Sequence, residues 1–144
     1  MYCKGLTKEQ LKDIGVVDVK WSRHTNNWIV YRYWYRHGKD KEKRLTTINP
    51  AIMVQRHKYG KDKFYYKVQF NYKGKSIAYP LGRFIYVWFY EDIPDGDFVV
   101  DHIDNDPLNN KLENLQLLTI EENNRKRFED LDIKCINQYH NTTR

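Results

Sequence analysis

Residues 101–110 read Asp-His-Ile-Asp-Asn-Asp-Pro-Leu-Asn-Asn, and this stretch decides how the second half of the chain folds. An apolar, β-prone run precedes it at residues 98–100, and a second such run follows at 115–118. Asp, Asn and Pro turn formers lie between the two runs. The pattern predicts two strands joined by a long loop, with Asp101 and His102 where the first strand opens into that loop.

A helix should follow the second strand. Thr119 and Glu122 form a capping box, which predicts a helix from about Ile120 with Asn123 in its first turn. A helix packed across the hairpin would bring Asn123 beside Asp101. Two oxygen ligands on one side of a hard cation leave its other positions for water and a phosphate oxygen. Asn124 is the alternative ligand, but the spacing favours Asn123.

His102 and Asn114 complete the candidate site. An imidazole titrates near neutrality, so His102 can take a proton from a water molecule. Adjacent strand residues point to opposite faces, so Asp101 and His102 could flank a phosphate from two sides. Asn114 carries both a donor and an acceptor, which can tie the loop backbone and fix His102. Together these residue types favour metal-assisted hydrolysis of a phosphodiester.

The acidic loop has other interpretations. Asp104, Asn105 and Asp106 can be explained as turn formers without any ligand. A calcium loop of the EF-hand type is excluded, because starts at Asp101 or Asp104 place neither Gly at the sixth position nor Glu at the twelfth.

The motif Asp-His-Ile-Asp-x-x-Pro-Leu-Asn-Asn, followed by Asn-Leu and Glu-Asn, resembles the HNH endonucleases. The similarity is greatest to phage and intron homing enzymes with Asn at the last motif position. This resemblance implies a ββα-metal finger with its core at about residues 98–128. It also implies that Asp101 and Asn123 hold one divalent cation, that His102 is the general base and that Asn114 clamps the loop. Asn rather than His at position 123 favours Mg²⁺ or Mn²⁺.

The rest of the chain predicts an α+β fold, in which antiparallel β-hairpins and a bracing helix precede the finger. Residues 1–60 form a strand-rich DNA-docking region, and residues 61–144 form the nuclease region with its preceding hairpin and helix. We expect one continuous compact unit, with residues 131–136 docked onto the finger. The expected helices are 7–14 and 81 to about 93, and the expected strands are 16–20, 28–36, 44–48, 64–70 and 76–79.

Composition indicates the partner and the compartment. The chain has 144 residues and a net charge of +6, which favours an anionic partner, here double-stranded DNA. It has no long apolar run for a membrane span and only two cysteines, Cys3 and Cys135, too few for a four-cysteine structural zinc site. No signal-peptide pattern opens the chain. We therefore expect a cytoplasmic protein with reduced cysteines, in a bacterial host cell if it is phage-encoded.

Two basic groups are candidate phosphate contacts. One surrounds the hairpin of residues 64–79, and Arg32, Arg36 and Lys20 would extend it along the first hairpin. The other follows Asn123 on the predicted helix. The alternative for any single lysine is a solvated surface position. The predicted contacts are Lys67, Lys73, Lys75, Arg125, Lys126 and Arg127, with Lys61 and Lys63 beside the first group.

The combined interpretation is a metal-dependent DNA endonuclease of the homing type. A noncatalytic DNA-binding module is the alternative, and a nuclease acting on RNA is a third possibility. A complete set of Asp101, His102 and Asn123 favours the enzyme, because a binding module has no need of a base beside a metal ligand. One metal site per chain predicts that a monomer nicks DNA, whereas a homodimer could break both strands.

Overall fold

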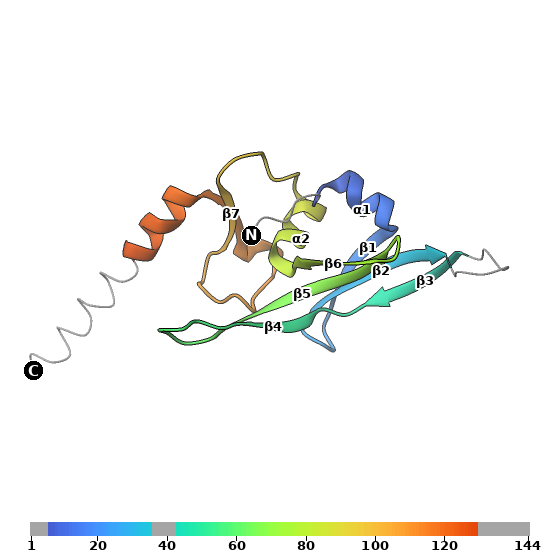
Figure 1. The fold of residues 1–144 in the computed structure, drawn as a ribbon, viewed down its shortest axis with the longest axis horizontal. Coiled ribbons are helices and arrows are strands. Elements are labelled where there is room, and N and C mark those ends of the chain that lie inside the picture. Colours follow the sequence, from blue (N-terminus) through green and yellow to red (C-terminus); the bar gives the residue numbers. More distant parts are fainter. Residues whose placement is uncertain (1–5, 36–42, 130–144) are drawn as a thin grey trace, which may run out of the picture.

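The computed structural model describes residues 6–35 and 43–129 (Figure 1). Helix α1 (Lys8–Ile14) comes first, and its ends confirm the predicted caps. The Thr7 hydroxyl accepts from the Gln10 amide at 3.1 Å, and Gly15 ends the helix with a φ of 99°. The predicted free thiols of Cys3 and Cys135, the predicted phosphate contact of Arg36 and the docking of residues 131–136 lie outside the described residues.

Two antiparallel sheets form the body of the protein. The first has the strand order β1-β2-β3 and contains the strands predicted at residues 16–20, 28–36 and 44–48, and the second has the order β4-β5-β6. The strands are β1 (Val16–Ser22), β2 (Asn27–Tyr35), β3 (Lys43–Ile48), β4 (Ala51–Gln55), β5 (Lys63–Tyr72) and β6 (Lys75–Pro80).

Strand β4 was not among the predicted strands. It pairs with β5 along its whole length, from Ala51 opposite Lys67 to Gln55 opposite Lys63. Most of its residues are exposed, so the strand shows no regular alternation of buried and exposed positions. Residue 60, the predicted division between the two regions, falls in the loop of this β4–β5 hairpin.

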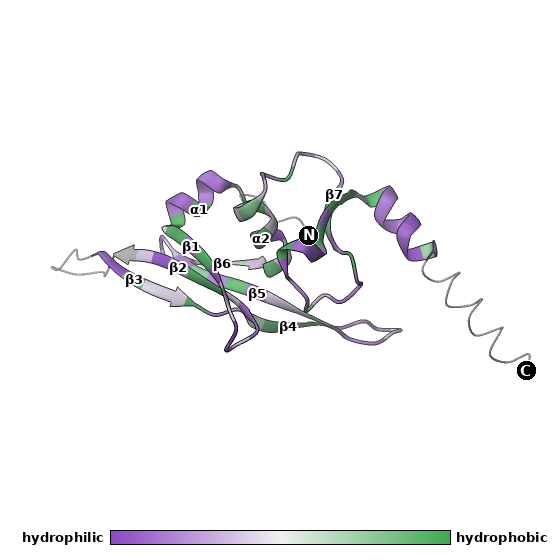
Figure 2. Cartoon of the chain, turned by 180° about the vertical axis from the view of Figure 1, so that it is seen from behind, coloured by the Kyte–Doolittle hydropathy of each residue, from purple (hydrophilic) through white to green (hydrophobic). Residues whose placement is uncertain are grey.

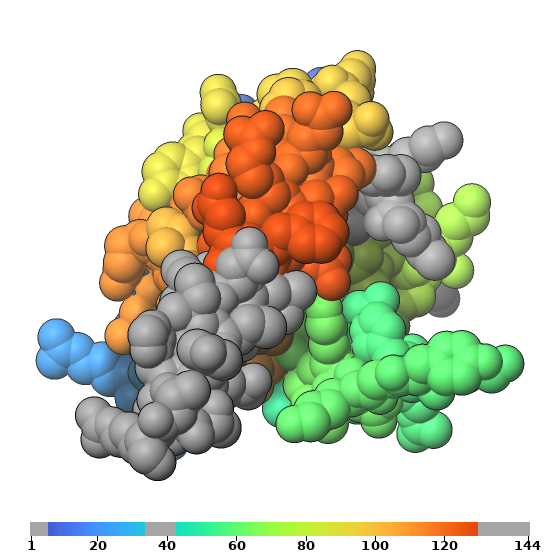
Figure 3. Space-filling model, turned by 90° about the vertical axis from the view of Figure 1, so that its left-hand side faces the viewer, coloured from blue at the N-terminus to red at the C-terminus, as the bar shows by residue number. Residues whose placement is uncertain are grey.

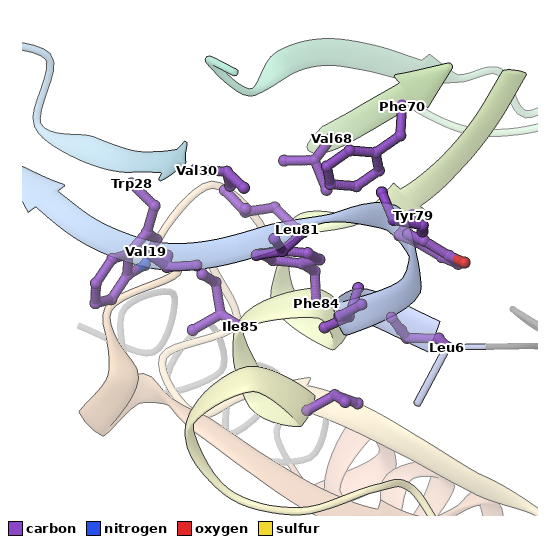
Figure 4. Close-up of a cluster of buried hydrophobic side chains, with 14 of the residues drawn as sticks. Leu6, Val19, Trp28, Val30, Val68, Phe70, Tyr79, Leu81, Phe84 and Ile85 are labelled. Carbon is purple, nitrogen blue, oxygen red and sulfur yellow. The ribbon is translucent and has the colours of Figure 1, made fainter. Parts of the chain in front are cut away.

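Helix α2 (Leu81–Phe89) lies between the sheets and the last part of the chain. It contacts β5 and β6 on one side and β7 and β8 on the other, the bracing position that was predicted. The helix ends at Phe89, about four residues earlier than expected; Phe89 and Tyr90 are exposed, and Ile93 packs against the core from the loop that follows. A single hydrophobic core joins both sheets to this helix (Figure 4), including Val19, Trp28, Val30, Val68, Phe70, Leu81, Phe84 and Ile85.

Arg32 corrects one prediction about the surface. Its side chain points into the protein and is only 8% exposed. Its Nε donates to the carbonyl of Ile14 at 3.0 Å, and its Nη2 donates to the carbonyl of Asn71 at 2.6 Å. Arg32 therefore joins the end of α1 to the second sheet, and the prediction that it extends a DNA-binding surface is wrong.

The remaining elements form what we call the finger, residues 98–129. Strands β7 (Phe98–His102) and β8 (Leu115–Thr119) pair in antiparallel fashion, and a helix follows over residues 120–129, here called the finger helix. The Thr119 amide donates to the Glu122 carboxylate at 3.2 Å, and the Glu122 amide donates to the Thr119 hydroxyl at 3.1 Å. These bonds confirm the capping box. Among the described residues, no helix is long and apolar enough to cross a membrane.

Candidate functional site

Asp101 lies in β7 directly opposite Gln116 of β8. One of its carboxylate oxygens, Oδ2, accepts from Gln116 Nε2 at 2.8 Å and from Lys126 Nζ at 2.7 Å. The other oxygen, Oδ1, forms no hydrogen bond within the described part of the chain. Gln116 and Lys126 thus fix the orientation of the carboxylate and leave Oδ1 for another ligand.

Lys126 is surrounded by oxygen atoms. Besides Asp101, its ammonium group donates to the carbonyls of His102 and Ile103 at 3.0 and 3.3 Å, and to Asn105 Oδ1 at 3.0 Å. Lys126 was predicted to contact phosphates, but here its charge is directed into the finger. The oxygen atoms around the ammonium are the hard donors that Mg²⁺ and Mn²⁺ prefer.

The donor chemistry therefore fits a divalent cation next to Asp101. Within residues 6–35 and 43–129, no three His, Cys, Asp or Glu side chains come together as a ligand set. A cation here would depend on the single carboxylate of Asp101, on amide oxygens and on water. Mg²⁺ commonly keeps several water ligands and takes only one or two from protein carboxylates.

His102 is held by a neighbouring asparagine. Its Nε2 lies 2.8 Å from Oδ1 of Asn110, a side chain that is only 2% exposed. In this orientation the amide oxygen is the acceptor, so the contact suits the neutral tautomer that carries its proton on Nε2. Asn110 itself is held in place, since its carbonyl accepts from Trp28 Nε1 at 2.6 Å.

Gly82 of α2 allows this close packing. A Cβ atom at position 82 would lie 3.1 Å from Asn110 Oδ1 and 3.3 Å from His102 Nε2. Both distances are tighter than ordinary van der Waals contact, so a larger residue would press on the His102–Asn110 pair. The helix that braces the finger is therefore also in contact with the candidate base.

Asn114 holds the loop between β7 and β8 closed. Its Oδ1 accepts from the amide of Asp104 at 3.1 Å, and its Nδ2 donates to Asp104 Oδ1 at 2.9 Å and to the carbonyl of Asn109 at 2.8 Å. The Asn114 carbonyl also accepts from the amide of Ile103 at 2.8 Å. The side-chain partner of His102 is Asn110, however, so Asn114 affects His102 only through the loop.

Asp104 and Asp106 act as turn formers. Asp104 Oδ1 accepts from the Asp106 amide at 2.8 Å, and Asp106 Oδ1 accepts from the Leu108 amide at 3.0 Å. The hydrogen bond from Asn109 is the main cause that lowers the pKa of Asp104, followed by the bond from the Asp106 backbone. The turn interpretation of these two residues is confirmed.

Three of the predicted site residues, Asp101, His102 and Asn123, line one groove of about 840 Å³, whereas Asn114 does not line it. Asn123 lines the groove and is half-buried, whereas Asn124 is exposed, which supports the choice between them. The finger contributes Asp101, His102, Asn105, Asn123 and Arg127 to the groove, and the β4–β5 hairpin contributes Asp62, Lys63 and Phe64.

The candidate DNA contacts are distributed unevenly. Arg127 lines the groove, and Arg125 is exposed on the finger helix. Lys67 is half-buried in the middle of β5. Lys73 lines a different hollow, next to the junction of α1 and β1, and Lys75 lies beside it at the β5–β6 turn. The structure does not bring Lys73 and Lys75 to the groove, and Lys63 takes that place.

Two residues at the site were missed by the sequence analysis. Gln116 could have been found, because the register of the predicted hairpin pairs it with Asp101. Asn110 offered a weaker signal, since it is one of two adjacent asparagines and only its burial distinguishes it from Asn109.

The comparisons with known proteins agree with this site. The family model for HNH endonuclease matches residues 81–125, from the start of α2 into the finger helix. The matched segment includes Asp101, His102, Asn114 and Asn123, and it confirms the resemblance predicted from the motif. No curated protein and no solved structure matches the chain. An HNH endonuclease region indicates a nuclease or DNA-binding role.

Proposed function

We propose that this chain is a metal-dependent DNA endonuclease that hydrolyses phosphodiester bonds. One observation carries the proposal: Asp101, His102 and Asn123 line a single groove within the segment that matches the HNH endonuclease family. The positive net charge of the chain suits a polyanionic substrate.

Asp101 and Asn123 would hold one divalent cation, Mg²⁺ or Mn²⁺. When bound, such a cation neutralises a nonbridging phosphate oxygen and stabilises the departing 3′ oxygen. Asp101 is suited to this role because Gln116 and Lys126 orient its carboxylate through Oδ2. Residues that orient a ligand in this way commonly affect metal affinity or activity by about 10–100-fold.

His102 would take a proton from the attacking water through Nδ1. By accepting from Nε2, Asn110 would favour the tautomer in which Nδ1 is the basic atom. Asn110 is thus a positioning residue, and Gly82 gives it room. Asn114 positions the loop between β7 and β8, which carries Asn110, by donating to the carbonyl of Asn109.

The biological setting is also part of the proposal. We infer a homing-type enzyme encoded by a phage, acting on double-stranded DNA in the cytoplasm of a bacterial host cell. With one site per chain, a monomer would nick one strand, and a homodimer could cleave both.

Conversion of supercoiled plasmid in Mg²⁺, Mn²⁺ or chelator tests the activity. His102→Ala and Asn123→Ala should abolish nicking, and Asn124→Ala is the matched control because this neighbouring side chain is exposed. Metal-dependent nicking that persists in both site variants would refute the assignment. Linear product from the native protein would indicate a dimer.

A noncatalytic DNA-binding module is the second candidate, and the ion pair between Lys126 and Asp101 favours it. This pair already neutralises the carboxylate without any metal. Duplex binding that is insensitive to chelator, with no cleavage of varied plasmid and genomic DNA in either metal, would select this alternative.

A further inference from the structure

The outer part of the β4–β5 hairpin, residues 51–67 and here called the ribbon, extends beside the finger (Figures 1 and 2). Every residue from 54 to 64 is exposed, including Tyr59 in the loop. The tip of the ribbon is hydrophilic, as its purple colour in Figure 2 shows. Because residues 54–64 are all exposed, both faces of this part of the ribbon are accessible to a partner.

One face of the ribbon is turned toward the site. Val54 pairs with Phe64, and opposite residues of an antiparallel pair share a face of the sheet. By alternation along β5, this is the face on which Val68 and Phe70 enter the core. Phe64 is 48% exposed, yet it lines the groove that also contains Asp101 and His102. The ribbon therefore forms the wall of the groove that lies opposite the finger.

The tip of the ribbon is strongly positive. Its cations are Arg56, Lys58, Lys61 and Lys63, and its one carboxylate is Asp62. None of these cations forms an ion pair within the described residues. In contrast, the finger cation Lys126 is fully engaged by Asp101 and its neighbours.

The positive surface is continuous with the site. A second hollow of about 540 Å³ is lined by Lys58, Lys61 and Lys63 of the ribbon together with Arg127 of the finger helix. Lys63 and Arg127 also line the groove with His102. In Figure 3 the green tip lies below the orange and red finger helix on the same side of the molecule. A phosphate backbone lying in the groove would continue along these cations.

We propose that the ribbon and the finger form a clamp that holds duplex DNA between them. In this clamp Lys58, Lys61 and Lys63 contact the phosphates that flank the bond at His102. This inference rests on the proposed function, since it assumes that the groove takes DNA. A two-stranded β-ribbon also has the width that the major groove admits. The contacts predicted from the sequence, Lys73 and Lys75, lie beyond the other end of β5, about 30 Å from Lys63 at 3.3 Å per residue.

Two triple variants with the same change in charge test the clamp. The first is Lys58→Gln, Lys61→Gln and Lys63→Gln in the ribbon. The second, the control, is Lys43→Gln, Lys73→Gln and Lys75→Gln, three exposed lysines away from the groove. Both are made in the His102→Ala background and measured in chelator, so that no DNA is cut. Binding to a fluorescent duplex is followed by anisotropy between 50 and 200 mM salt.

Three phosphate contacts contribute about 2.7 to the slope of log affinity against log salt, which equals about 40-fold in affinity over this range. Between 50 and 200 mM salt, the fold-loss of affinity should therefore be about 40 times smaller for the ribbon variant than for its parent. The ribbon variant should also bind more weakly than its parent at 50 mM salt. The control variant should keep a slope close to that of the parent. Equal unfolding midpoints for the three proteins would exclude misfolding as the cause.

Equal losses in both variants would overturn the clamp, because binding would then follow net charge rather than position. An unchanged slope in the ribbon variant, or no duplex binding by the parent, would also overturn it. If the ribbon variant binds duplex more weakly but the native protein never cleaves plasmid, the clamp is retained and the nuclease is rejected. If the native protein cleaves plasmid but the ribbon variant binds duplex as its parent does, the nuclease is retained and the clamp is rejected.

Discussion

Replacing Asn114 with alanine should destabilise the protein by about 3.5 kcal/mol. The change removes three hydrogen bonds of the side chain, two to backbone groups and one to the carboxylate of Asp104. A neutral bond contributes about 1 kcal/mol and a bond to a charged group about 1.5–3 kcal/mol. Asp104 is exposed, so the lower end of that range applies.

For a chain of this length, about 3.5 kcal/mol corresponds to a fall of roughly 7–14 °C in the unfolding midpoint. Differential scanning calorimetry measures it directly. Asn124→Ala is the control, because it removes an exposed side chain from the finger helix and should change stability by less than about 0.5 kcal/mol.

An Asn114→Ala midpoint within about 2 °C of the native value would contradict this expectation, because the loop would then close without the Asn114 side chain. A large fall in the unfolding midpoint of the Asn124→Ala control would also contradict it, because the finger would then be sensitive to the loss of any side-chain amide.

Three further predictions concern the same region. Asn110→Ala should slow plasmid nicking by about 10–100-fold and change its pH profile, while the Mg²⁺ affinity measured by calorimetry stays the same. Gly82→Ala should slow nicking without lowering the unfolding midpoint, because the added Cβ presses on Asn110 and His102 at the start of a helix that alanine favours. The pKa of Asp104 is lowered in the folded protein, so its carboxylate contributes stability above a pH of about 4 and loses it as the pH falls through the folded value. Urea unfolding between pH 2.5 and 6 should show this loss in the native protein and a smaller one in Asn109→Ala.

Local signals were sufficient for much of the fold. The caps at Thr7 and Gly15 gave α1, and the reciprocal bonds of Thr119 and Glu122 gave the start of the finger helix. These features depend on residues within one or two turns of each other, which a sequence displays directly. The hairpin of β7 and β8 was found because two apolar runs flank a loop rich in turn formers.

Long-range contacts decided the features that the sequence analysis missed. Arg32 follows the pattern of a solvent-facing cation on a strand, but the carbonyls of Ile14 and Asn71 turn it inward. Neither partner is near Arg32 in the sequence, so no local pattern reveals them. Strand β4 was missed for a related reason, since its pairing with β5 defines it and its side chains remain largely exposed.

Asp101 shows how far residue types can identify a site. The motif was enough to select this carboxylate as a candidate ligand, but it could not distinguish the two carboxylate oxygens. The structure distinguishes them, because Gln116 and Lys126 both donate to Oδ2. Gln116 reaches it by strand register, and Lys126 by lying one helical turn after Asn123 on the same face of the finger helix. The helix that carries the candidate ligand thus also supplies a competing positive charge, so a cation at Asp101 must bind beside Lys126 or displace it.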